Sequence, residues 1–181
     1  MPRSVPSVEL FCDAIRESVA AHSADLAREW IDWLAGVPGA NERFTEMWKK
    51  EGEGIYDRLG NALGLRCVRE RYHRVDAVYS ADGGCREADV LIALEHENNI
   101  RTASGEVKKL AALDAPLNVV VTYPVTKNPD QEKSRYLSEY ERILTESGSR
   151  TGEHLVVFGT LRDRTIEWTF HLFGGSTFRE L

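Results

Sequence analysis

The segment ADVLIALEHENN, residues 88–99, joins a long apolar run to two acidic side chains. A continuous apolar run of this kind predicts a buried central strand. Side chains alternate between the two faces of a strand, so Glu95 and Glu97 are expected on one face, roughly 7 Å apart. Two carboxylates on one face of a core strand repel each other and resist burial. A divalent cation would remove this conflict, because carboxylate oxygens suit Mg²⁺, Mn²⁺ or Ca²⁺.

The composition predicts a single globular domain over residues 1–181. Hydrophobic residues make up 42% of the chain and charged residues 29%, which is ordinary for a protein with one packed core. No apolar stretch approaches the roughly 20 residues of a membrane span, and residues 1–9 show no secretory signal. We therefore expect a cytoplasmic protein that makes no membrane contact. The net charge of −6 gives no overall attraction to nucleic acid, so binding of that kind would need a local basic patch.

The three cysteines predict neither a disulfide framework nor a zinc site. Cys12, Cys67 and Cys85 are odd in number, widely spaced and form no CxxC pair. We expect reduced thiols that are buried or half-buried.

Hydrophobic periodicity and turn residues predict an α/β protein with the element order α-α-β-β-β-α-β-α-β-β. Helices are expected over residues 8–35, 41–63, 103–113 and 129–147. Strands are expected over residues 66–72, 74–80, 88–98, 117–123, 154–160 and 164–173. The prediction is a mixed central sheet with helices on both faces, in which N-terminal helices span 8–63 and a C-terminal helix and hairpin span 129–173.

A third acid is expected next to the pair on the long strand. Asp76 lies among apolar residues of the strand 74–80, and this strand should pair with 88–98 because the two are consecutive. Asp76 can then lie beside Glu95 on a shared face. His96 should point the opposite way from Glu95 and Glu97, so we interpret it as a histidine of the core edge and not as a ligand.

Residues of the second predicted helix suggest a fourth acid. On a helical wheel with Phe44 at 0°, Glu51 falls at about 340°, on the apolar side with Trp48. The alternative is a glutamate at the edge of the apolar stripe, neutralised by a neighbouring Arg or Lys.

With Asp76 and Glu95 in these places, the chain resembles the PD-(D/E)xK nuclease superfamily, which has the restriction-endonuclease-like fold. The family core runs helix, three-strand meander, helix and strand, and the resemblance covers about residues 41–123. Asp76 matches the acid of the second strand and Glu95 the acid of the third. Glu97 stands where the family usually has lysine, and Val75 stands where it usually has proline before the first acid.

The resemblance implies a divalent-metal-dependent phosphodiesterase that acts on nucleic acid, DNA more readily than RNA. Mg²⁺ or Mn²⁺ would be held by Asp76 and Glu95, with Glu51 and Glu97 as further ligands. Glu97 would be general base or ligand. Lys109, on the next helix, could stand in for the missing motif lysine, although an ordinary surface lysine is the alternative.

Two other classes of function remain open from the sequence. The fold could serve as a catalytically inactive module that binds nucleic acid or a protein, or the acids could form a metal-free dyad acting on a sugar. A basic cluster could track a phosphate backbone or form a solvated strand face; it comprises Arg66, Arg69, Arg71, His73 and Arg74. A two-fold homodimer is a further expectation, with Trp30, Trp33 and Trp48 as suspected anchors.

Overall fold

Seven strands form one mixed sheet in the computed structural model, which describes residues 5–83, 86–113, 115–148 and 152–181. The strands lie side by side in chain order: β1 (Arg66–Arg71), β2 (Val75–Ser80), β3 (Ile92–Glu97), β4 (Leu117–Thr122), β5 (Glu153–Arg162), β6 (Thr165–Phe173) and β7 (Phe178–Glu180). The central strands β3, β4 and β5 are parallel, and the other neighbouring pairs are antiparallel. This bears out a mixed α/β architecture.

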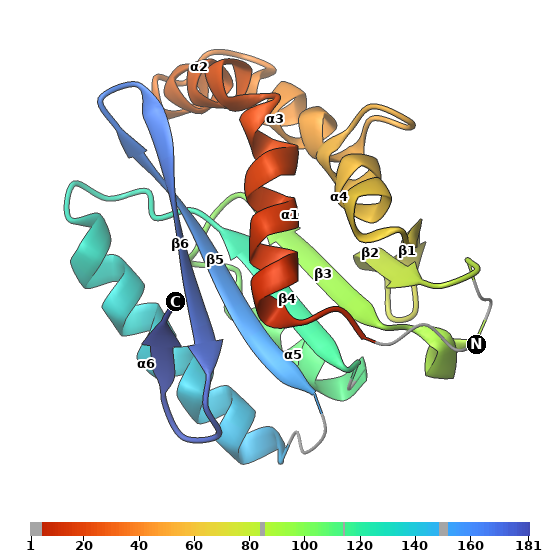
Figure 1. The fold of residues 1–181 in the computed structure, drawn as a ribbon. Coiled ribbons are helices and arrows are strands. Elements are labelled where there is room, and N and C mark those ends of the chain that lie inside the picture. Colours follow the sequence, from red (N-terminus) through yellow and green to blue (C-terminus); the bar gives the residue numbers. More distant parts are fainter. Residues whose placement is uncertain (1–4, 84–85, 114, 149–151) are drawn as a thin grey trace.

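Helices cover both faces of the sheet (Figure 1). One face carries α1 (Val8–Ala20), α2 (Ser23–Leu34), α3 (Ala40–Lys49) and α4 (Ile55–Leu63). The other carries α5 (Ser104–Leu113) and α6 (Pro129–Ser147). The sheet therefore separates two hydrophobic cores, since inward side chains of each strand alternate between the two helical layers.

The two long N-terminal helices of the prediction are wrong, because each is two helices in the structure. The predicted helix 8–35 is interrupted between Ala20 and Ser23. The predicted helix 41–63 is interrupted after Lys49 by a turn containing Gly52, which has φ +76°. Gly54 closes that turn, and a Cβ there would lie 2.6 Å from the carbonyl oxygen of Lys50. Apolar periodicity runs through such a break, because both helices pack on the same core.

The strand predicted over 88–98 is also shorter than expected. Glu87–Asp89 forms a 3₁₀ turn, and β3 begins only at Ile92. The short strand β7 was not predicted; it pairs with the end of β6. Elements from α5 to β6 lie within two residues of the predicted bounds.

The described cysteines agree with the prediction of free thiols. Cys12 is buried and Cys67 is half-buried, and both are unpaired with any other cysteine. Cys85 lies outside the described residues. Within the same described part of the chain, no helix is long and apolar enough to cross a membrane.

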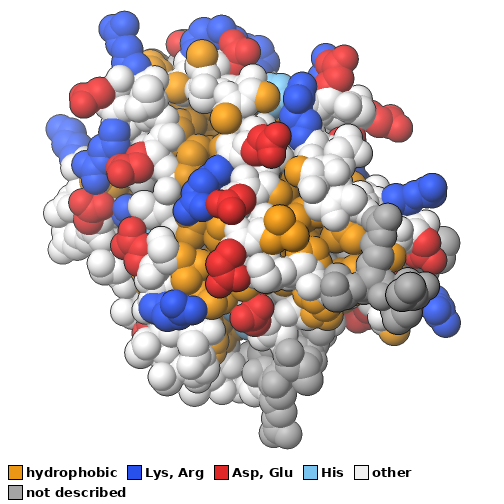
Figure 2. Space-filling view, in the orientation of Figure 1, with side chains coloured by type: hydrophobic (Ala, Val, Ile, Leu, Met, Phe, Trp, Pro, Cys, Tyr) orange, Lys and Arg blue, Asp and Glu red, His pale blue; other side chains and the backbone are white. Residues whose placement is uncertain are grey.

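The face of the molecule that α1 covers has no dominant charge. Figure 2 shows acidic and basic side chains interspersed over it, with hydrophobic side chains visible between them. A mixed surface of this kind offers no long-range attraction to a polyanion.

Candidate active site

Asp76 and Glu95 face each other across two neighbouring strands. The pairing of Ala77 with Leu94 places Asp76 directly opposite Glu95 in the antiparallel register of β2 and β3. The backbone N–H of Asp76 donates to Glu95 Oε2 at 3.4 Å, and the backbone N–H of His96 donates to Asp76 Oδ2 at 3.0 Å. Each carboxylate is thus fixed by the backbone of the opposite strand. Asp76 and Glu95 therefore lie beside each other, as expected from the pairing of their strands.

A polar hollow of about 370 Å³ opens over these carboxylates. It lies where β3 ends, and the charged residues that line it are Asp76, Glu95, Glu97, Lys49, Glu106 and Lys109. The ends of parallel strands in an open α/β sheet are the usual place for a ligand. The hollow therefore combines a favourable position with a dense set of ionisable side chains.

Two lysines contact the two carboxylates from opposite helical layers. Lys109 Nζ, on α5, lies 2.6 Å from Glu95 Oε1 and 2.5 Å from Glu106 Oε2. Lys49 Nζ, at the end of α3, lies 3.0 Å from Asp76 Oδ1. Asp76 and Glu95 each have an ammonium group as partner, so the fold tolerates these two carboxylates in its core.

Burial dominates the protonation of Glu95. Its side chain is almost fully buried, and this desolvation raises the pKa of Glu95 to about 8, although the hydrogen bond from Lys109 lowers it and the charge of Asp76 raises it further. Burial lowers the pKa of Lys109, but its hydrogen bonds to Glu106 and Glu95 raise that pKa by more. A further cation close to Glu95 would lower the pKa of this carboxyl group and favour its ionised form.

Glu97 lines the same hollow but belongs to its outer rim. It is half-buried, and its Oε1 accepts from the backbone N–H of Asn99 at 3.1 Å. The adjoining Asn98 donates to Asn41 Oδ1 at 2.7 Å and to Thr45 Oγ1 at 2.8 Å, which ties the end of β3 to α3. The loop that carries Glu97 is held in place by these contacts.

His96 points to the opposite face, as predicted. Its ring stacks on Trp48, with centroids 4.2 Å apart, and its Nε2 lies 3.0 Å from the hydroxyl oxygen of Tyr123. Burial lowers the pKa of His96 to about 3, so the ring is neutral. His96 borders the hollow, but its ring packs on Trp48 and Tyr123 and supports the strand from behind.

Glu51 is placed away from the site. The prediction that it lies on the buried stripe of a helix is wrong, because α3 ends at Lys49 and Glu51 is exposed in the following turn. It lines a different depression, together with Asp57 and Arg66. Across the described ranges, no group of three His, Cys, Asp or Glu side chains is close enough to hold one metal ion.

The donor set nevertheless fits a cation that a substrate helps to bind. Mg²⁺ is commonly held by one or two carboxylates while substrate phosphate and water complete its shell, and Asp76 with Glu95 supplies such a pair. Glu97 stands at the rim of the same hollow. Of the predicted residues, Glu95 contacts both Asp76 and Lys109. Glu97 lines the same hollow.

Lys49 and Glu106 were missed by the sequence reasoning. Lys49 directly follows the buried Trp48 in the last turn of α3, which is a signal that its ammonium group can reach the sheet edge. Glu106 lies three residues before Lys109, the spacing at which two side chains on a helix meet. Neither signal distinguishes these residues from ordinary surface charges without the register of β2 and β3.

The N-terminal part of the basic cluster serves partly to hold the fold. Arg69 donates to the carbonyl oxygens of Lys49 and Lys50 and forms an ion pair with Asp57. The side chains of Arg71, His73 and Arg74 are exposed at the β1–β2 hairpin. Arg66 is also exposed, at the start of β1, so Arg69 is the member of this cluster that its contacts make less available to a phosphate.

Comparison with known proteins adds no family to this geometry. No family model matches the chain, and no curated protein matches it.

Proposed function

We propose that this protein is a divalent-metal-dependent nuclease with a PD-(D/E)xK type of site. The observation that carries the proposal is the placement of Asp76 opposite Glu95, with the ammonium group of Lys109 2.6 Å from Glu95. The chain around this site runs helix, three-strand meander, helix and parallel strand, from α4 to β4. Asp76, Glu95 and a lysine therefore lie together, although this lysine is Lys109 and not the residue at position 97, where the family usually has it.

Asp76 and Glu95 would hold Mg²⁺ or Mn²⁺. When bound, such an ion polarises the scissile phosphate and lowers the pKa of a coordinated water. Lys109 has three N–H donors and gives two of them to Glu95 and Glu106, so one is left for a phosphate oxygen. Glu97 supplies a carboxylate at the rim that can take a proton from the attacking water.

A nicking assay tests this proposal directly. Supercoiled plasmid is incubated with the protein and Mg²⁺ or Mn²⁺, and wild type is compared with Asp76→Asn. Glu51→Gln is the matched control, since it removes one acid at an exposed position outside the hollow. We expect cleavage by wild type and by Glu51→Gln but not by Asp76→Asn. Cleavage that survives in Asp76→Asn would refute the assigned site.

A catalytically inactive module is the second candidate, and one observation favours it. Lys49 and Lys109 already pair with Asp76 and Glu95, so each of these two carboxylates has a cationic partner without a metal. Thermal unfolding with and without Mn²⁺ distinguishes the two candidates. A nuclease site predicts that Mn²⁺ stabilises wild type by about 2.7 kcal/mol at a hundred times its dissociation constant, and that Asp76→Asn with Glu95→Gln loses this gain. Equal behaviour of both proteins would favour the inactive module.

We further propose that the protein works in the cytoplasm on DNA as a two-fold dimer, so that both strands of a duplex can be reached. The suspected anchors Trp30 and Trp48 are buried in the core and are not available for contact. Trp33 is half-buried beside the exposed Leu34 at the end of α2, and this end is the remaining candidate for the interface. Light scattering at high micromolar concentration tests it; a strict monomer would contradict the dimer.

A further inference from the structure

A second and larger hollow, of about 810 Å³, lies beside the candidate active site. It is formed by the loop after β4 and the first turns of α6, and its basic residues are Arg101, Lys127 and Arg135. Among the residues that the structure describes, Glu132 is the single acid in its lining. The proposed function does not use this hollow.

Glu132 offsets only part of the positive charge of the hollow, because it pairs with Arg101 and leaves Lys127 and Arg135 without a carboxylate from this lining. Its side chain is buried, with 6% exposed, and its Oε2 accepts from the backbone N–H groups of Val125 at 2.9 Å and Thr126 at 3.1 Å. Its other oxygen lies 3.5 Å from Arg101 Nε. Glu132 therefore shapes the loop and holds Arg101 at the wall of the hollow.

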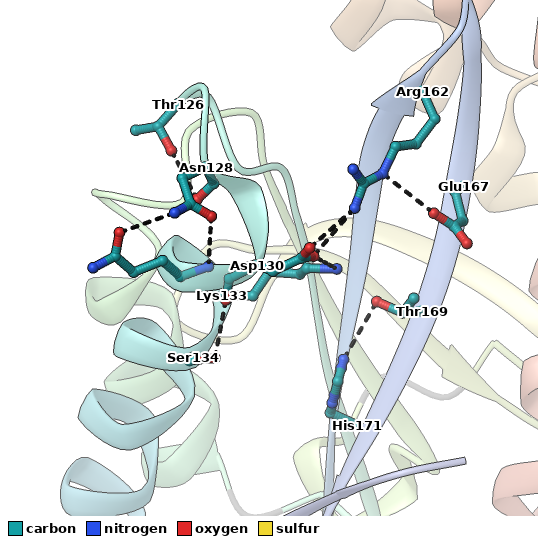
Figure 3. Close-up of polar contacts among 10 residues, drawn as sticks. Thr126, Asn128, Asp130, Lys133, Ser134, Arg162, Glu167, Thr169 and His171 are labelled. Atoms are coloured by element: carbon teal, nitrogen blue, oxygen red, sulfur yellow. Dashed lines mark hydrogen bonds and ion pairs between the residues drawn. The ribbon is translucent and has the colours of Figure 1, made fainter.

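The start of α6 is fixed from its other side as well (Figure 3). Asn128 caps the helix, with its side chain accepting from the backbone N–H of Gln131. Asp130 points toward β5, and its carboxylate lies 3.2 Å from Nη2 of Arg162 at the end of that strand. The same carboxylate lies 3.2 Å from Nζ of Lys133, one turn further along α6. Asp130 is thus engaged with β5, while Lys127 and Arg135 line the hollow.

The two hollows lie next to each other at one edge of the sheet. Glu97 pairs with Thr122 at the ends of the parallel strands β3 and β4. Asn99 lines the acidic hollow and Arg101, two residues later, lines the basic one. On the far side of the acidic hollow, β2 begins at the β1–β2 hairpin, whose exposed cations are Arg71, His73 and Arg74.

The sheet order therefore gives a row of charges: basic at the β1–β2 hairpin, acidic at β2 and β3, and basic beyond β4. Three strand spacings of about 4.8 Å make this row about 14 Å long. A nucleic-acid strand advances about 3.4 Å per nucleotide, so the row matches about four nucleotides. A single phosphate or a small anion would fill only one of the basic ends.

We propose that this row is a binding track for the phosphodiester backbone of a nucleic-acid strand, with basic contacts on both sides of the bond above Asp76 and Glu95. The inference rests on the proposed nuclease function, because that function places the scissile phosphate at the acidic centre. Arg101, Arg135 and Lys127 bind the phosphates on one side, and Arg71 with Arg74 bind those on the other. Guanidinium groups suit this role since they pair with phosphate through two parallel hydrogen bonds.

The test measures binding without cleavage. Fluorescein-labelled duplex and single-stranded oligonucleotides are titrated with the protein in EDTA, at several salt concentrations, and anisotropy gives the dissociation constant. Arg101→Ala with Arg135→Ala weakens one end of the track, and Arg71→Ala with Arg74→Ala weakens the other. Each double variant should lower the slope of log K against log salt by about two, because each phosphate contact contributes about one.

Arg142→Ala is the matched control for Arg135. It lies on the same helix, seven residues or about 10 Å further along, and it is exposed in an ion pair with Glu146. Thermal unfolding confirms that each variant is folded, and Lys127→Gln provides a variant that disturbs no contact of Glu132. We expect wild-type affinity for Arg142→Ala and weaker binding for Lys127→Gln.

Three results would overturn the track: no binding of any oligonucleotide by wild type, unchanged binding by both double variants, or equal competition by polyglutamate, which would indicate a surface for any polyanion. Failure of the track and failure of the nuclease proposal are distinguishable. Variant-sensitive binding without cleavage supports the track and contradicts catalysis. Cleavage by wild type, together with a dissociation constant that is unchanged in both double variants, supports catalysis and refutes the track.

Discussion

Glu95 and His96 are neighbours in the chain, yet they occupy opposite environments on the two faces of β3. His96 lies among aromatic rings, with Trp48 stacked on it and the Tyr123 hydroxyl at its Nε2. Glu95 lies among charges, opposite Asp76 and in contact with Lys109. One strand therefore packs an aromatic layer with one face and lines a charged hollow with the other.

The aromatic layer behind β3 is expected to contribute strongly to stability. Trp48 is fully buried between α3 and the sheet, so Trp48→Ala should lower the free energy of unfolding by about 3–5 kcal/mol through lost burial and a cavity. Urea unfolding measures the loss. Trp33→Ala is the control, because Trp33 is half-buried and should lose less. Equal losses in both variants would contradict a special role for the layer behind β3.

On the charged side, Lys109 is expected to matter for rate more than for stability. Lys109→Ala should slow metal-dependent cleavage by about 10²–10³-fold, the usual effect of removing a group that stabilises charge in the transition state. Mn²⁺ binding should tighten in the same variant, since an ammonium group next to Glu95 repels the ion. Plasmid nicking and Mn²⁺ titration by calorimetry measure the two effects.

Lys108→Ala provides the matched control for Lys109. Lys108 is the preceding residue on α5 and is exposed, so its removal changes the net charge equally without touching the hollow. A Lys108→Ala protein as slow as Lys109→Ala would mean that net charge, not the contact with Glu95, sets the rate.

The alternating faces of β3 could be predicted from sequence because a strand has a period of two. The acidic pair and the opposed histidine followed from that period, and the neighbour Asp76 followed from the meander order. The bounds of the helices before β1 could not be predicted from sequence periodicity. A turn such as the one after Lys49 leaves the apolar stripe unchanged on both sides, and so Glu51 was assigned to a helix that had already ended.

The ion-pair partners of the acidic residues could not be predicted from the local sequence pattern either. Lys49 reaches Asp76 from 27 positions earlier in the chain, and Arg101 reaches Glu132 from 31 positions earlier. Such contacts depend on how the helices pack on the sheet, and the spacing of residues along one element does not predict them. The sequence identified Lys109 as a candidate, but only the packing of α5 on β3 brings its Nζ to Glu95.

Without metal, the stability linked to Glu95 and the stability linked to His96 should depend on pH in opposite directions. The pKa of His96 is lowered to about 3 by burial, so between that pH and the ordinary value of 6.5 the unfolded chain binds more protons than the native one. Stability linked to His96 is therefore lost as pH falls below 6.5. The pKa of Glu95 is raised to about 8, mainly by burial, so between 4.5 and 8 the native chain binds more protons. Stability linked to Glu95 is therefore lost as pH rises toward 8.

The two effects oppose each other between pH 4.5 and 6.5, and single substitutions separate them. His96→Phe should remove the loss at low pH, so its stability relative to wild type should rise by up to about 1.4 kcal/mol for each pH unit below 6.5. Glu95→Gln should gain relative to wild type by a comparable amount per unit from pH 5 to 8. Urea unfolding in EDTA at pH 5, 6, 7 and 8 measures both slopes. Parallel curves for Glu95→Gln and wild type would show that Lys109 keeps Glu95 ionised throughout, and the carboxyl group would then need no further cation.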